Sequence, residues 1–267
     1  MLKGRLRHLS QTAACPLPES LHLLSFNMQV GIHTQAYHHY LTRAWQHLLP
    51  SQERQHRLQL IAHQLKAFDI IGLQEVDGGS LRTLFVNQVT HLAEKADFFW
   101  HYQQTNRNLG RWAQHSNGVL ARWQPWQVQD HQLPGLPGRG AVVAFFGNKK
   151  QPLVIVNAHL ALSPSAQSKQ IDYLCRVIAP YPHLVLMGDF NASYAQLARH
   201  PSLQALGLIS TQDPGISTYP SWRPQRHLDH ILHTPTLKAQ SLQVGHPLFS
   251  DHCPISTQLQ IPAICRN

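Results

Sequence analysis

The chain has 267 residues, of which 43% are hydrophobic, enough to form the core of one large domain or of two small ones. Only 13% are Asp, Glu, Lys or Arg, which argues against a disordered chain and against a coiled coil. The formal net charge is +9, and 20 histidines add to it as the pH falls below about 6.5. This balance favours a polyanionic partner or an anionic surface, although a solvated basic face is an alternative interpretation.

The cysteines and the apolar runs indicate a cellular compartment. The four cysteines (Cys15, Cys175, Cys253 and Cys265) lie far apart without a CxxC pair, so they predict neither a zinc site nor a disulfide framework. The first 20 residues begin with basic residues but contain no continuous apolar run, so we expect no signal peptide. No apolar stretch approaches the about 20 residues of a transmembrane helix. We therefore expect a cytoplasmic protein without a transmembrane segment, and nothing in the sequence indicates an obligate protein partner.

After a polar leader over residues 1–20, apolar stretches follow one another closely along the chain. Three stretches have the apolar spacing of amphipathic helices: residues 51–68, which Ser51 could cap, residues 81–92 and residues 171–178. Short apolar runs predict strands at residues 21–27, 69–75, 98–104, 117–122, 140–146, 152–160, 184–191, 227–234 and 254–261.

The strands recur faster than the helices, so a purely parallel sheet is excluded. We find no internal repeat and no low-complexity linker. The pattern predicts one mixed α/β domain over residues 21–261, followed by a short tail over residues 262–267.

Residues 184–191, LVLMGDFN, combine four apolar residues with a polar end. Alternate residues of a strand share a face, so Asp189 and Asn191 would point the same way while Phe190 points to the core. Asp and Asn are also common turn residues. The octapeptide alone is compatible with a turn and with a functional pair.

The same combination recurs at the ends of the other predicted strands. Burying such polar groups singly costs several kcal/mol, whereas a set that converges on a hydrated metal and a substrate is readily tolerated. Each residue alone is more often a turn or core residue, but the set in this order is specific. Its members are Asn27, Glu75, His159, Asp189, Asn191, Asp229, Asp251 and His252.

The segments that contain these residues, SFN, LQEV, NAHL, GDFN, LDHI and SDHCP, resemble the endonuclease/exonuclease/phosphatase superfamily over roughly residues 21–261. This superfamily includes DNase I-like nucleases, abasic-site endonucleases, deadenylases, sphingomyelinases and inositol-polyphosphate phosphatases. The resemblance implies a four-layer α/β sandwich, in which two mixed, mainly antiparallel sheets face each other with helices outside. It also implies a metal-dependent hydrolase of phosphoester bonds.

The resemblance implies a metal site and an acid/base pair. Glu75 and the side-chain oxygen of Asn27 would hold Mg²⁺ or Mn²⁺, with Asp251 as a direct or water-mediated ligand. His252 is the acid/base candidate because an imidazole titrates near neutrality. Asp229 resembles the carboxylate that orients its ring.

Three more residues complete the implied reaction centre. Asp189 resembles the residue that aligns or deprotonates the attacking water, and Asn191 and His159 would donate to phosphoryl oxygens. The sequence leaves open whether His252 or Asp189 takes the proton of the water, and whether one or two metal ions bind.

The candidate substrate contacts come from loops. Arg139 follows a Gly/Pro loop and could bind a phosphate, and Asn117 resembles an Asn at the rim of the family's active site. Residues 101–118 and 217–231, which include Trp222, interleave cations with aromatic rings. This composition suits phosphate contact and base stacking, although the same residues could pack a loop on the rim.

The motifs also depart from two subgroups of the superfamily. LQEVDGG lacks the Thr and Lys that follow LQE in abasic-site enzymes, and MGDFNAS lacks the Trp and Arg of inositol-phosphatase-like enzymes. The LQEV form looks more like the deadenylase, sphingomyelinase and uncharacterised bacterial branches. We expect a phosphodiesterase on nucleic acid or nucleotides; the alternatives are an enzyme for a lipid headgroup or small phosphoester, and a catalytically inactive binding module.

Overall fold

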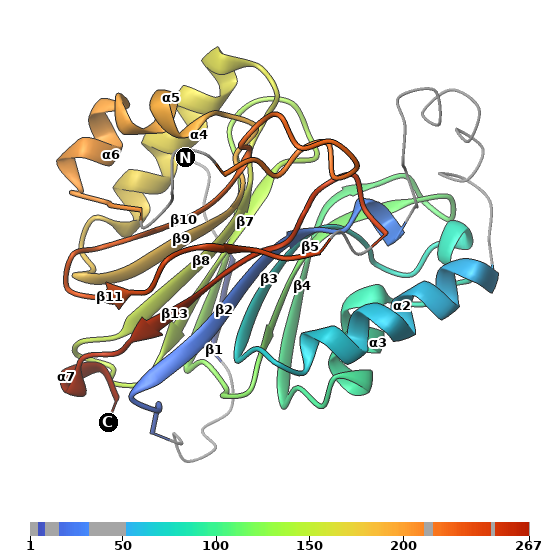
Figure 1. The fold of residues 1–267 in the computed structure, drawn as a ribbon, viewed down its shortest axis with the longest axis horizontal. Helices are drawn as coiled ribbons and strands as arrows, with labels where there is room; N and C mark the ends of the chain where they lie inside the picture. The colour runs from blue at the N-terminus through green and yellow to red at the C-terminus, as the bar shows by residue number, and fades with distance from the viewer. Residues whose placement is uncertain (1–4, 9–15, 32–51, 211–215, 247–248, 267) are drawn as a thin grey trace.

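The structure is a computed structural model that describes residues 5–8, 16–31, 52–210, 216–246 and 249–266. Two β-sheets face each other, and helices cover the outer face of each (Figure 1). Among the described strand pairs, β2–β3 and β8–β9 are parallel and the others are antiparallel. The four-layer sandwich of mixed, mainly antiparallel sheets is thereby confirmed.

Each sheet is built from strands that are distant in the sequence. The first sheet has the order β1 (Arg5–His8), β6 (Gln127–Gln132), β7 (Gly140–Phe146), β8 (Leu153–His159), β9 (His183–Asp189) and β10 (Asp229–His233). The second has the order β11 (Lys238–Ala239), β13 (Ile255–Gln260), β2 (Ser20–Asn27), β3 (Ile70–Asp77), β5 (Gln114–Ala121) and β4 (Trp100–Asn108), and β12 (Gln243–Val244) pairs with β13.

The helices lie in two groups (Figure 1). α2 (Gln52–Leu65) and α3 (Gln88–Lys95) cover the second sheet, and α4 (Pro164–Ile178), α5 (Tyr194–Ala198) and α6 (Pro201–Ala205) cover the first. Short helical turns lie at η1 (Gln29–Gly31), η3 (Leu81–Thr83) and α7 (Ala263–Arg266). No described helix is long and apolar enough to cross a membrane.

Three apolar layers hold the sandwich together: one between the sheets and one beneath each group of helices. The central strands are buried on both faces, which explains why they read as continuous apolar runs. The expected strands are all present within a few residues. By contrast, no apolar run predicts β6, because it contains mostly polar residues, QVQDHQ.

The expectation of one helix over residues 81–92 is wrong. The chain forms η3 and then α3, and between them Leu84 and Phe85 adopt a left-handed backbone with φ of 55° and 60°. Leu84 is 43% exposed and Phe85 56%. The Asp77 carboxylate holds the preceding turn, because it accepts the backbone N–H groups of Gly79 and Ser80 at 2.8 and 2.7 Å. Ser51, the expected cap of the helix before it, lies outside the described residues.

Residues outside 21–261 also contact the sandwich. β1, within the stretch assigned to the leader, pairs with β6 as an edge strand. At the other end, the Cys265 carbonyl accepts the backbone N–H of Asn148 at 2.9 Å, and the Arg266 carbonyl accepts that of Leu17 at 3.0 Å.

Candidate active site

Polar strand-end residues of the first sheet form a row at one end of the sandwich. His159 of β8 is the register partner of Asp189 of β9, and Asp189 is the partner of Asp229 of β10. On the other side, Gly140 of β7 pairs with His159, so Arg139 enters the same row. The strand pairing alone therefore brings together residues that are up to 90 positions apart in the sequence.

Gly188 explains how the chain presents Asp189. Its φ is +144°, and a Cβ at this position would lie 1.8 Å from the carbonyl oxygen of Ala158. Only glycine tolerates this close approach, which brings β9 against β8 immediately before Asp189. Asp189 Oδ1 then accepts the backbone N–H of Asn191 at 2.9 Å and turns the chain. Asp189 thus makes the turn and also reaches the site, since its other oxygen faces two histidines.

Asn191 forms the turn directly after Asp189. Its backbone has a left-handed φ of 51°, and its side-chain Nδ2 donates to the carbonyl oxygen of Leu160 at 3.1 Å. This residue was expected to donate to a phosphoryl oxygen. In the structure one N–H of its amide ties the turn after β9 to the end of β8, and its contact with a phosphoryl oxygen stays a prediction.

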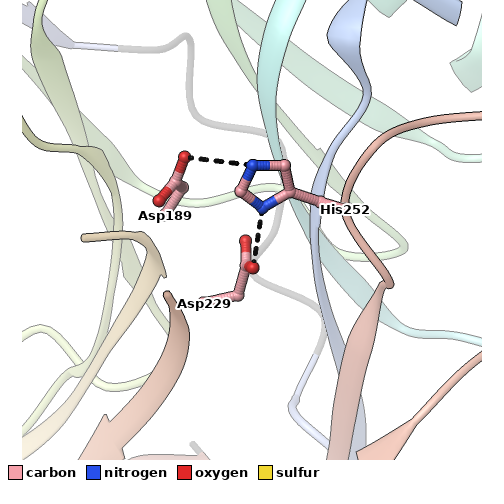
Figure 2. A group of neighbouring side chains, drawn as sticks. All are labelled: Asp189, Asp229 and His252. Atoms are coloured by element: carbon pink, nitrogen blue, oxygen red, sulfur yellow. Dashed lines mark hydrogen bonds and ion pairs between the residues drawn. The ribbon is translucent and has the colours of Figure 1, made fainter. Parts of the chain in front are cut away.

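A histidine and two carboxylates form the buried centre (Figure 2). His252 Nδ1 lies 2.8 Å from Asp229 Oδ2, and its Nε2 lies 3.9 Å from Asp189 Oδ2. Thr218 donates its hydroxyl to the same Asp229 oxygen at 2.6 Å. The backbone N–H of His252 donates to the Ser250 hydroxyl at 3.1 Å, which fixes the loop that carries the ring. The Asp229 carboxylate therefore contacts the His252 ring; its role as the orienting partner of a catalytic histidine stays a prediction.

The charges of this centre depend on one another. Burial alone would lower the pKa of His252, but the carboxylates of Asp229 and Asp189 outweigh burial and hold that pKa well above its ordinary value. Burial alone would raise the pKa of Asp189, yet the charge of His252 and the hydrogen bond and charge of His159 hold it well below its ordinary value. The raised pKa of His252 and the lowered pKa of Asp189 favour an imidazolium beside an ionised Asp189 carboxylate at neutral pH.

His159 connects this centre to the second sheet. Its Nε2 lies 3.4 Å from Asp189 Oδ2 and 3.8 Å from Glu75 Oε1. Arg139 Nη1 lies 2.8 Å from His159 Nδ1, so the guanidinium is next to the site, and its contact with a phosphate stays a prediction. His159 thus lies between Glu75, Asp189 and Arg139.

The expected metal ligands lie on the second sheet and the loop before β13. The Glu75 side chain is 36% exposed, whereas Asn27 and Asp251 are buried. Asn27 donates its Nδ2 to Asp189 Oδ2 at 3.0 Å, and its Oδ1 accepts the backbone N–H of Gln29 at 3.1 Å. Ser250 Oγ lies 3.4 Å from Asp251 Oδ1.

The donor set fits a hard divalent cation. Glu75, Asp189 and Asp251 offer carboxylate oxygens, and Asn27 Oδ1 has a second lone pair beside its bond to Gln29; Mg²⁺ and Mn²⁺ prefer such ligands. Among the described residues another trio also comes close together: ligand atoms of Asp189, Asp229 and His252 lie within 4.8 Å of one another. In that trio Asp229 and His252 already bind each other, so the His252 Nδ1 atom is occupied by the Asp229 carboxylate.

The other expected substrate contacts have different surroundings. Asn117 is fully buried and not at the rim: its Nδ2 donates to Gly140 O at 3.0 Å and to Gln104 Oε1 at 3.2 Å, which joins the two sheets. Trp222 is half-buried in the loop before β10. The same loop supplies Tyr219, whose ring centroid is 4.9 Å from that of His252.

A protein-family model and several solved structures are similar to this chain. The model of the "Endonuclease/Exonuclease/phosphatase family" matches residues 24–252. Similar solved structures include a family member from Bacteroides thetaiotaomicron (18% identity, 91% of this chain and 98% of that chain, TM-score 0.65) and a mannosyl-6-phosphatase from the same organism (17%, 90% and 100%, 0.65). Another is TDP2 of D. rerio with a single-strand DNA product (16%, 91% and 100%, 0.65). No curated protein matches this chain by sequence.

Proposed function

We propose, because the chain belongs to the endonuclease/exonuclease/phosphatase family, that it is a divalent-metal-dependent phosphodiesterase acting on nucleic acid or nucleotides. Membership in this family of phosphoesterases supports a hydrolase. The observation that carries the proposal is the His252 ring, held between Asp229 and Asp189, while His159 links Asp189 to Glu75.

Each side chain has a role that its surroundings support. Asp189 is ionised and, with one oxygen held by Asn27, orients and deprotonates the attacking water. His252 carries a proton on both ring nitrogens; Asp229 binds Nδ1–H, which leaves Nε2–H to donate to a phosphoryl oxygen. Glu75, Asn27 and Asp251 would hold the metal, which when bound stabilises negative charge on the phosphoryl group.

The choice of nucleic acid rests on the basic rim. Arg107 and Arg111 are exposed at the end of the β4–β5 hairpin, at the same end of the second sheet as Glu75. A Cβ on Gly138 would lie 3.8 Å from the Arg107 side chain, so this arginine lies beside the turn that carries Arg139 into the site. Exposed cations leading to a phosphate-binding centre are what a polyanionic chain requires. Trp112 on the same hairpin, 60% exposed, could stack on a base.

A second candidate, hydrolysis of a phosphoester in a lipid headgroup, is favoured by one observation. Leu84, Phe85, Leu109 and Trp112 are all exposed. The loop with the first two lies against the hairpin with the others, because Leu81 N–H donates to the Arg111 carbonyl at 2.7 Å. Exposed apolar side chains at one rim are typical of a surface that contacts a membrane or a partner.

The test is a substrate panel: supercoiled DNA, RNA, bis-p-nitrophenyl phosphate and sphingomyelin vesicles, each with Mg²⁺ or Mn²⁺ and with EDTA. We expect hydrolysis of nucleic acid and of the small diester with metal and none with EDTA, and loss of both in Glu75→Gln. Hydrolysis that survives EDTA, or a fully active Glu75→Gln variant, would contradict the metal-dependent mechanism.

Salt dependence separates the two candidates. If Arg107 and Arg111 bind phosphates, replacing both with Ala should reduce the slope of log affinity for duplex DNA against log salt by about 0.9 per lost contact. Trp112→Ala should weaken single-strand binding with little change in slope. The rate on the small diester should not change. No binding to DNA or RNA near 100 mM salt, with cleavage of sphingomyelin, would favour the second candidate.

A further inference from the structure

We infer that Asn157 is a positioning residue for Glu75: its side-chain amide reaches across from the first sheet and holds the β-bulge that turns Glu75 into the site. The inference rests on the proposed role of Glu75 as the metal anchor. It adds a residue that does not itself face the reaction centre.

A register shift in the second sheet determines where Glu75 points. Leu73 pairs with Gly118 and Val76 with Ser116, so Gln74 and Glu75 on β3 lie opposite the single residue Asn117 on β5. Glu75 has a left-handed φ of 52°, which is rare for a residue with a side chain. An extra residue with an irregular backbone on one strand of an antiparallel pair is a β-bulge.

The bulge changes the face on which Glu75 lies. Leu73 and Val76 both belong to the apolar layer beneath α2 and α3. In a regular strand, residues two apart share a face, so Glu75 would follow Leu73 into that layer. Because of the extra residue, Val76 occupies this position in the apolar layer. Glu75 instead faces the opposite sheet, where its carboxylate lies 3.8 Å from His159.

Asn157 uses all of its hydrogen-bonding groups at this bulge. It is fully buried on β8 of the first sheet. Its Nδ2 donates to the carbonyl oxygens of Leu73 at 3.0 Å and Gly118 at 2.9 Å, the last regular pair before the register shift. Its Oδ1 accepts Gln74 Nε2 at 2.6 Å, which fixes the residue before Glu75.

The fold makes room for this amide. A Cβ on Gly72 would lie 2.7 Å from Asn157 Oδ1, so glycine lets β3 come close to it. Ile155, two residues earlier on the same face of β8, belongs to the apolar layer between the sheets. Without Asn157, the buried carbonyl oxygens of Leu73 and Gly118 would each lose the hydrogen bond from its amide. A regular pairing of β3 with β5 would then compete with the bulge and turn Glu75 away from the site.

The first experiment compares Asn157→Leu with Ile155→Ala, a matched change of a buried residue on the same strand and face. Binding of Mn²⁺ is measured by titration calorimetry without substrate. Asn157→Leu should weaken Mn²⁺ binding by roughly tenfold or more, the range seen when a partner of a metal ligand is removed. Ile155→Ala should change it less than about twofold if its only effect is on stability. Equal losses in the two variants would show a general effect on packing and overturn the inference.

A double variant tests whether Asn157 acts through Glu75. Asn157→Leu combined with Glu75→Gln should bind Mn²⁺ no more weakly than Glu75→Gln alone, because the bulge then positions no carboxylate. Additive losses would overturn the inference. If Asn157→Leu does not fold, Asn157→Ser, which retains one donor, is measured in the same way, and an unchanged affinity would also overturn it.

Amide hydrogen exchange tests the bulge independently of the metal. Exchange at residues 74–77 should become faster in Asn157→Leu than in Ile155→Ala, while exchange at residues 70–72 stays slow in both. If Glu75→Gln leaves Mn²⁺ affinity unchanged, the metal role in the proposed function fails, and the hydrogen exchange still decides whether Asn157 holds the bulge.

Discussion

The dipeptide Asp-His occurs twice at the site end of the sandwich, at residues 229–230 and 251–252. The two copies differ in which of their residues reaches the centre of the site. In the first pair Asp229 faces the site, whereas His230 faces the layer beneath the helices, where its Nε2 donates to the Ala192 carbonyl at 2.8 Å. In the second pair it is the histidine that reaches the centre, where His252 binds Asp229. Each dipeptide thus contributes one member of the proposed acid/base pair.

The two histidines show what determines the charge of a buried imidazole. Both are buried. Burial, with the charge of His227, lowers the pKa of His230 to about 3. The pKa of His252 is raised well above its ordinary value, because the carboxylates of Asp229 and Asp189 outweigh the same effect of burial. Burial alone makes a histidine neutral, and a pair of buried carboxylates reverses this.

Replacing His252, the charged histidine, should have the largest effect on the rate and tests the comparison of the two histidines. His252→Ala should lower the rate of diester hydrolysis by roughly 10²–10⁴-fold, because it removes the proton donor. The pair His252→Ala, Asp229→Ala should be about as slow as His252→Ala alone, since members of one catalytic unit are not additive. The measurement is the steady-state rate on bis-p-nitrophenyl phosphate with Mg²⁺ at pH 8.

The control is His230→Gln, which removes the other histidine and should retain a rate close to that of the wild type. If the losses from His252→Ala and Asp229→Ala multiplied in the pair, Asp229 would not act through His252. A His230→Gln variant as slow as His252→Ala would show that the two histidines are not distinguished as described.

Buried strands can be recognised in the sequence because they are continuous apolar runs. Several of these runs end in polar residues, which indicates where the polar row begins. The apolar run of LVLMGDFN and its polar end could therefore be recognised without coordinates, whereas Asp229 was expected inside its strand and is the first residue of β10, opposite Asp189. The orientation of Glu75 could not, because a bulge breaks the strand period on which such predictions depend.

Residues that act from a distance give no local signal. Asn157 contacts the bulge before Glu75 only because β8 and β3, which are far apart in the sequence, face each other, and Thr218 reaches Asp229 from the irregular loop before β10. The apolar spacing at residues 81–92 was misleading for a different reason: Leu84 and Phe85 have the helical period but are exposed on a loop held by Asp77.

Replacing the aspartates of the two dipeptides, Asp251 and Asp229, should have a second, smaller effect on the rate. Asp251 raises the pKa of His252 less than Asp229 and Asp189 do, and it is an expected metal ligand. Asp251→Asn should lower the rate by about tenfold and raise the Mg²⁺ concentration needed for half-maximal activity, because an amide retains an oxygen ligand without the charge.

Asp229→Asn serves as the matched comparison. It should lower the rate without changing the Mg²⁺ requirement, because Asp229 binds His252 and Thr218. The measurement is the rate as a function of Mg²⁺ concentration for the wild type and both variants. An unchanged Mg²⁺ requirement in Asp251→Asn would remove Asp251 from the set of ligands.

The smallest expected effect is the contribution of His230, the neutral histidine, to the pH dependence of the free energy of unfolding. In the unfolded chain His230 gains a proton below about pH 6.5, whereas in the folded protein its pKa is about 3. The unfolded state therefore binds more protons in this window, and the free energy of unfolding falls as the pH drops from about 6.5 towards 3, by up to about 1.4 kcal/mol per pH unit.

His230→Gln cannot gain this proton, and its side-chain amide can still donate to a carbonyl. Between pH 8 and pH 5 it should lose about 2 kcal/mol less stability than the wild type, measured by urea unfolding at both values. Other buried histidines whose pKa is lowered by burial, such as His131 and His183, are present in both proteins, so their contributions cancel in the difference. His63→Gln, at an exposed position of α2, controls for the loss of a histidine as such. If the wild type and His230→Gln lost equal stability, His230 would be charged in the folded protein and the contrast with His252 would fail.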